Sequence, residues 1–194
     1  MRKKSHISLA CYLVQDSLTW ELQRHKKAFC LGNILPDCKP SFLTTKHEFD
    51  GTFDMLQGKI RTLTDSEDRL THNERAYMRH LGEVVHYIAD YFTFPHNDTY
   101  EGNLKDHCYY EKELKFGLRR YIKSGQAEED KQEITAFASA EDLFLYIRRT
   151  HEEYLSRQRD VEDDCIYIVR ICNQVVQAIL QLLSQPASDL LCLA

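Results

Sequence analysis

The chain has 194 residues, of which 43% are hydrophobic and 28% are charged, with a net charge of −5. This size and composition are typical of a globular protein, and predict a single domain that spans residues 1–194 and buries a core. The low content of glycine and proline argues against a β-sandwich. The acidic balance argues against stable binding to nucleic acid or anionic membranes, because phosphate binding by charge requires a basic face.

Cysteine usage and the absence of long apolar runs predict the compartment. The seven cysteines show no CxxC spacing, which favours free thiols in a reducing compartment over a disulfide framework. The basic start, Met1 to Lys4, is followed by a short apolar run and no cleavage site, so no signal peptide is predicted. No apolar run approaches the ~18 residues of a transmembrane helix. We therefore expect a cytoplasmic protein with no transmembrane segment.

Apolar residues at three- and four-residue steps predict an all-α fold, a bundle of about six or more helices. The first predicted helix covers residues 5–29, with Ser5 as its N-cap. The segment 32–40 is expected to form a loop that carries Asp37. Further helices are predicted at 50–63, 72–92, 103–123, 139–157 and 161–184, with a polar surface loop at 126–133.

Residues 86 to 111 contain a dense set of possible metal ligands. The steps from His86 to Asp90 and from His107 to Glu111 are both i, i+4, so each pair projects from one face of a helix. His96 lies between the two pairs, directly after Pro95. Imidazole and carboxylate groups together suit zinc. These five possible ligands are more than one ion needs, and they predict a cluster of ions.

Three more residues of ligand type lie upstream, namely His6, Asp37 and His47. The other histidines fit no ligand spacing and are not expected to bind metal; they are His25, His72, His80 and His151.

The layout resembles the zinc-dependent phospholipase C of Gram-positive bacteria and the related S1/P1-type nucleases. These are all-helical enzymes with three zinc ions in a cleft. The motif His86-x3-Asp90-x5-His96 carries the resemblance most specifically. The pair His107-x3-Glu111 resembles the last ligand pair, and its glutamate favours the phospholipase branch over the nuclease branch. The chain also resembles the small intracellular members of the phospholipase C family that occur in Firmicutes.

The resemblance implies two or three Zn²⁺ ions per chain. In the family pattern one ion is held by Asp37, His47, His86 and Asp90. Asp90 bridges to a second ion, which His6 also binds. A third ion is held by His96, His107 and Glu111. The amine and carbonyl of Met1 would complete the shell of the second ion; the alternative is that Met1 to Lys4 form a disordered basic tail.

The resemblance further implies a metal-dependent phosphoric diester hydrolase. The ions would polarise the phosphodiester and lower the pKa of bound water to roughly 7 for in-line attack on phosphorus. Asp37 would act as the general base or orient the water. The substrate is a phosphodiester, such as a phospholipid headgroup.

Two other functions remain open, a non-catalytic metal-binding or metal-stabilised interaction protein and an S1/P1-like nuclease. A choline headgroup is not expected, because the acidic and aromatic residues that would face its cation are replaced by Lys4, Cys38 and Thr44. The sequence gives no indication of the oligomeric state.

Overall fold

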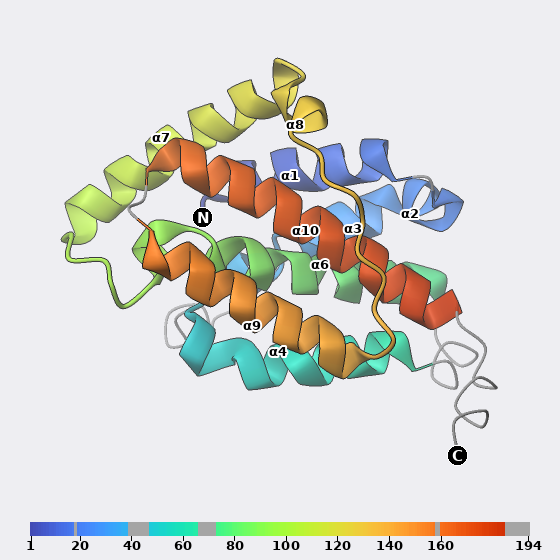
Figure 1. Ribbon diagram of the computed structural model, residues 1–194. Helices are drawn as coiled ribbons and strands as arrows, with labels where there is room; N and C mark the ends of the chain where they lie inside the picture. The colour runs from blue at the N-terminus through green and yellow to red at the C-terminus, as the bar shows by residue number, and fades with distance from the viewer. Residues whose placement is uncertain (18, 39–46, 66–72, 158–159, 185–194) are drawn as a thin grey trace.

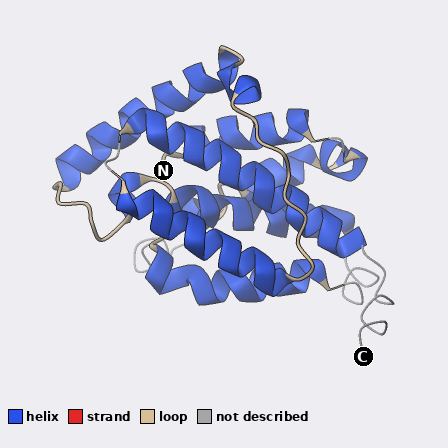
Figure 2. Cartoon of the chain, in the orientation of Figure 1, coloured by secondary structure: helices blue, strands red, loops and turns tan. Residues whose placement is uncertain are grey.

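The computed structural model describes residues 1–17, 19–38, 47–65, 73–157 and 160–184, and this part of the chain is helical and contains no strand (Figures 1 and 2). The predicted all-α bundle is confirmed. In chain order the elements are α1 (Lys3–Asp16), α2 (Trp20–Arg24), α3 (Lys26–Gly32), the 3₁₀ turn η1 (Pro36–Cys38), α4 (Phe49–Thr64), α6 (Glu74–Tyr91), the 3₁₀ turn η3 (Phe94–His96), α7 (Leu104–Lys123), α8 (Gln126–Glu129), α9 (Ala140–Ser156) and α10 (Val161–Ser184).

Helix α6 occupies the centre of the bundle and packs against α3, α4 and α10. Its apolar residues recur at helical spacing, and Leu81, Val85 and Ile88 are fully buried. Helix α10 crosses in front of α6, with α7 on one side and α9 on the other (Figure 1). This arrangement places the last turn of α6 near the first turns of α1 and α7.

Helix α10 is, within the described residues, the one helix long and apolar enough to cross a membrane. In the structure 67% of its most apolar window is buried against other helices. A central helix of a packed core has the same length and composition, and the position of α10 between α7 and α9 matches that role.

The single helix predicted at 5–29 is wrong, because the structure divides this segment into α1, α2 and α3. Ser17 ends α1 in an extended conformation, and its hydroxyl accepts a hydrogen bond from the Thr19 amide at 3.1 Å. His25 has a non-helical backbone conformation and separates α2 from α3. The apolar spacing continues across both breaks, so periodicity alone does not reveal them.

Three further local predictions are corrected. Helix α1 begins at Lys3, so Ser5 is not its N-cap but a buried residue of the first turn. Asp37 lies in the 3₁₀ turn η1 rather than in an irregular loop. Part of the predicted 126–133 loop forms the short helix α8, which follows Gly125 in the left-handed region at φ 87°.

Two glycines allow α3 and α6 to approach at backbone distance. A Cβ atom on Gly82 would lie 2.2 Å from the carbonyl oxygen of Phe29, and one on Gly32 would lie 1.9 Å from that of Arg79. No flexible side chain is involved that could move aside. The close approach therefore requires glycine at both positions. It also determines where the C-terminal end of α3 lies along the axis of α6.

We predict that Gly82→Ala lowers the free energy of unfolding by about 1–3 kcal/mol, because the added methyl group meets backbone. Gly58→Ala in α4 is the matched control, since a Cβ there meets nothing within 4 Å. That control should raise stability by about 0.5–1 kcal/mol through helix propensity. Urea unfolding measures both changes; equal effects of the two substitutions would contradict the close packing of α3 on α6.

Candidate metal centre

Asp90 is the hub of the site. It lies in the last turn of α6, and its side chain is 1% exposed. Oδ1 lies 2.8 Å from the Met1 amine and 3.3 Å from His6 Nε2, while Oδ2 lies 3.0 Å from His47 Nδ1 and 3.2 Å from His86 Nε2. Burial alone would raise the pKa of Asp90, but the Met1 ammonium and the surrounding imidazoles outweigh it and hold the pKa well below its usual range.

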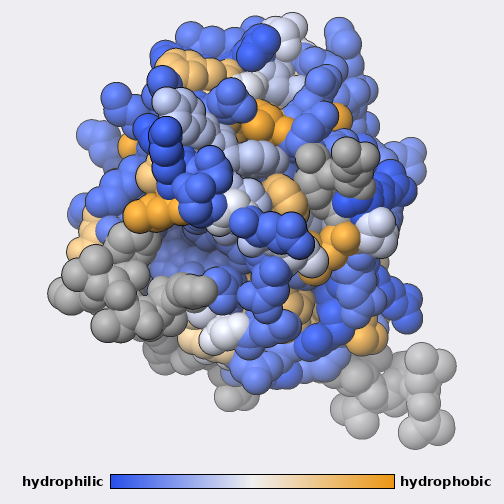
Figure 3. All heavy atoms as spheres, turned by 90° about the vertical axis from the view of Figure 1, so that its left-hand side faces the viewer, coloured by the Kyte–Doolittle hydropathy of each residue, from blue (hydrophilic) through white to orange (hydrophobic). Residues whose placement is uncertain are grey.

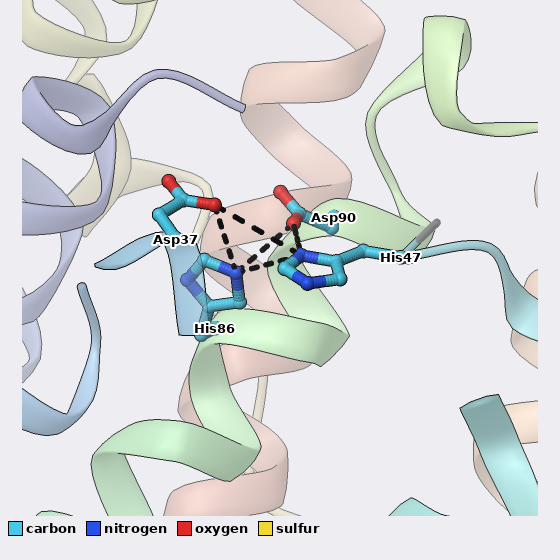
Figure 4. A group of neighbouring side chains, drawn as sticks. All are labelled: Asp37, His47, His86 and Asp90. Atoms are coloured by element: carbon cyan, nitrogen blue, oxygen red, sulfur yellow. Dashed lines mark hydrogen bonds and ion pairs between the residues drawn. The ribbon is translucent and has the colours of Figure 1, made fainter. Parts of the chain in front are cut away.

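The first group of possible ligands consists of Asp37, His47, His86 and Asp90, whose donor atoms all lie within 4.8 Å of one another (Figure 4). His86 Nε2 lies 3.0 Å from His47 Nδ1 and 3.6 Å from Asp37 Oδ1. The four residues come from η1, the segment before α4, and α6, and their side chains converge on one point. Two imidazoles and two carboxylates are a donor set that suits zinc.

The orientation of His86 is fixed by a backbone carbonyl. Nδ1 of His86 donates to the carbonyl oxygen of Asn33 at 2.9 Å. In the neutral ring the proton on Nδ1 leaves Nε2 as the bare nitrogen, and Nε2 faces the group. Asn33 directly follows α3, so the glycine contact between α3 and α6 positions this carbonyl. The role of Asn33 has no signal in the sequence, because any residue carries a carbonyl.

His6 supplies the observation that tests whether the residues fit a metal ion. Its side chain is fully buried, and neither ring nitrogen makes a hydrogen bond within the described residues. The ring stacks on that of His86 with centroids 4.0 Å apart. Burial, reinforced by the neighbouring His86, lowers the pKa of His6 to about 3, so its imidazole is neutral. Nε2 faces Asp90 Oδ1 at 3.3 Å, and Nδ1 has no hydrogen bond within the described residues. Buried ring nitrogens without a hydrogen bond are costly unless an ion accepts a lone pair, so the residues fit the implied metal.

A second group consists of His96, His107 and Glu111. Nε2 of both histidines lies 3.4 Å from Glu111 Oε1. His107 and Glu111 lie on adjacent turns near the start of α7, and a capping box between Asn103 and Asp106 begins that helix. Burial would raise the pKa of Glu111, but its contacts with His107 and His96 lower it far below the usual range.

Met1 joins the two groups. Its amine lies 2.7 Å from His96 Nε2, 2.8 Å from Asp90 Oδ1 and 3.1 Å from Glu111 Oε1. Burial lowers the pKa of this amine, but Asp90 and Glu111 reverse the effect and raise it overall. Met1 is 4% exposed and α1 starts at Lys3, so the alternative of a disordered tail is wrong. The structure thus brings the nine predicted residues into one continuous cluster: Met1, His6, Asp37, His47, His86, Asp90, His96, His107 and Glu111.

One side of the molecule is mainly hydrophilic. Figure 3 shows the face formed by the left-hand side of Figure 1, which is largely hydrophilic and hollowed, with single hydrophobic residues between polar ones. Of the residues expected to replace the choline contacts, Lys4 and Cys38 are both exposed. Thr44 lies outside the described residues.

The turn that carries His96 is held by residues that sequence reasoning missed. The carboxylate of Asp164 in α10 is fully buried and accepts from the Phe94 amide at 2.9 Å, from Tyr110 Oη at 3.0 Å and from Tyr154 Oη at 2.6 Å. The Asn97 amide group donates to the carbonyl of Thr93 at 3.1 Å. These contacts fix η3 from within the core, so that His96 points towards Glu111.

The described histidines outside the two groups have other contacts or lie on the surface. His25 contacts Glu74 on the surface, and His80 is 40% exposed. His151 is buried, stacks on Phe49, and lies 2.9 Å from Asn97 Oδ1, so it supports the His96 turn. His72 lies outside the described residues.

Comparison with known proteins identifies the family. The model of the zinc dependent phospholipase C family matches residues 5–161. The chain belongs to this family. Neither the search of curated proteins nor the search of solved structures finds a match. The match includes the candidate ligands from His6 to Glu111, while Met1 and Asp164 lie beyond it. Membership in the zinc dependent phospholipase C family supports a metal-dependent hydrolase of phosphodiesters.

We predict that Asp164→Asn weakens zinc binding at the His96 group by about 10- to 100-fold, as is typical when a group that orients a ligand is lost. Affinity at the Asp37 group should stay unchanged. Zinc competition titration with a chromophoric chelator measures the zinc affinities of the two groups separately. Asp163→Asn is the matched control, since it removes the same charge from the same helix end. Equal weakening of every ion would mean that Asp164 only stabilises the fold.

Proposed function

We propose that the chain, acting as one domain, is a phosphodiester hydrolase whose site holds two or three zinc ions. The observation that carries the proposal is the sharing of Asp90 between the Asp37 group and the residues Met1 and His6. A carboxylate with different partners on its two oxygens suits a bridge between two ions. The buried His6 supports the same reading, because neither of its ring nitrogens makes a hydrogen bond within the part of the chain that the structure describes.

Each ion would have its own set of ligands. The first ion would be held by Asp37, His47, His86 and Asp90. The third ion would be held by His96, His107 and Glu111. The second would lie between Met1, His6 and Asp90. When bound, the ions would supply Lewis acidity toward the phosphodiester and make hydroxide available near neutral pH.

Asp37 is the residue we propose as general base. One of its carboxylate oxygens is directed at His86 and His47, whereas the other points away from them (Figure 4). Burial raises the pKa of Asp37, which makes the carboxylate a better proton acceptor. The outward oxygen can accept the proton of an attacking water and orient it toward phosphorus, while the inner oxygen stays with the ligand group.

The experiment is hydrolysis of bis-p-nitrophenyl phosphate by protein purified without added chelator. Activity should disappear with a chelator and return with zinc. Asp90→Asn should reduce turnover below about 1% of wild type, because the charge that two ions need is lost. His80→Ala, on the same helix but outside the site, should leave it unchanged. A protein that binds zinc but shows no turnover would instead be a non-catalytic metal-binding protein.

We further propose that the Met1 amine is itself a zinc ligand. The amine lies within hydrogen-bonding distance of Asp90, His96 and Glu111, where it supplies the positive charge that an ion would bring. A peptide fused ahead of Met1 converts the amine to an amide and should reduce the zinc content by one ion per chain. The same peptide fused to the C-terminus is the control. Equal zinc content in both fusion proteins would refute the assignment.

A further inference from the structure

Helix α7 carries a stripe of unpaired cations on the side opposite its buried residues. The steps along this stripe are seven, three, four and four residues, which place its members on one helix face. The buried side is formed by Leu114, Leu118 and Tyr121. None of the cations forms an ion pair with another described residue, and Asp106 and Glu113 lie off the stripe. We call this set the basic face; it consists of Lys105, Lys112, Lys115, Arg119 and Lys123.

The start of α1 extends the basic face. The Arg2 guanidinium donates to the carbonyl oxygen of Cys108 in α7 at 2.9 Å, which holds the two helices together. Lys3 and Lys4 follow it and are exposed. Desolvation and the like charges of Arg2, Lys4, Lys112 and Arg119 lower the pKa of Lys115. Positive charge is therefore concentrated here although the whole chain carries a net charge of −5.

Large apolar side chains stand out between the cations. Leu104 is 79% exposed, Tyr109 57% and Phe116 51%. The Lys115 ammonium lies 4.0 Å from the centre of the Phe116 ring. Helix α7 spans about 30 Å, and it follows the upper left edge of the molecule, where no other helix covers its outer side (Figure 1). Lysines interleaved with aromatic and aliphatic residues are typical of helices that lie in a membrane interface.

We propose that the basic face docks the protein on an anionic lipid surface. The cations would attract the lipid phosphates, and Leu104, Tyr109 and Phe116 would enter the boundary between headgroups and acyl chains. The aliphatic Leu104 favours lipid over nucleic acid, since it offers no stacking surface to a base. His107 and Glu111 lie on the same helix, so docking would bring the metal centre next to the surface. The placement of a catalytic metal centre at the surface rests on the proposed function, whereas the docking itself does not.

The test is co-sedimentation of the full chain with phosphatidylcholine vesicles that contain about 30% phosphatidylglycerol. Binding is expected at about 0.1 M salt and should weaken at about 1 M, where the Debye length shrinks to about 3 Å. The triple variant Lys112→Glu, Lys115→Glu, Arg119→Glu should bind more weakly by at least about 100-fold, since losing each cation near such a surface costs about five-fold and the new carboxylates add repulsion. Vesicles of phosphatidylcholine alone should bind weakly.

The matched control is the triple variant Lys26→Glu, Lys27→Glu, Arg149→Glu, which changes the charge equally on exposed positions of α3 and α9. It should bind the anionic vesicles like wild type. Equal binding by both triple variants, or tighter binding of wild type to a single-stranded DNA oligonucleotide than to the vesicles, would overturn the proposal. Both variants should keep wild-type hydrolysis of bis-p-nitrophenyl phosphate, so a failure of docking is distinguishable from a failure of the proposed activity.

Discussion

The structure depends on the buried carboxylate of Asp90, whose side chain is 1% exposed. An ionised Asp90 inside the bundle is tolerable only if positive charge and hydrogen-bond donors surround it. The fold provides them from three directions: the chain start and α1 supply Met1 and His6, the segment before α4 supplies His47, and α6 itself supplies His86. The ends of distant segments meet at one residue, and the same arrangement offers nitrogen and oxygen ligands to metal ions.

Precise placement of these ligands comes from backbone packing rather than from the ligands themselves. The two glycines between α3 and α6 bring the Asn33 carbonyl to His86, and the hydrogen bond selects the ring nitrogen that faces the centre. On the other side Asp164 and Asn97 fix the turn that presents His96. A rigid support of this kind keeps the candidate ligands in place.

The parts of the site that the sequence predicts are those with a helical spacing. The i, i+4 pairs of α6 and α7 follow from strong amphipathic helices, and the fold class follows from the same periodicity. The helix breaks after α1 and α2 cannot be predicted from periodicity, because apolar spacing continues through Ser17 and His25. Asp164 resembles an ordinary acidic residue at the start of a helix, and only the structure shows that Tyr154 and Tyr110 donate to it. The net charge of the chain likewise gives no indication of the basic face, since a sum over all residues carries no information about position.

The central claim is that the cluster around Asp90 holds zinc, and anomalous diffraction at the zinc edge from crystals of the purified protein tests it most directly. Two or three peaks per chain are expected. One should lie about 2.0–2.1 Å from nitrogens of His47 and His86, and another should share Asp90 with it. Crystals grown with added zinc that show no peak at these residues, or ions bound only elsewhere on the chain, would contradict the account.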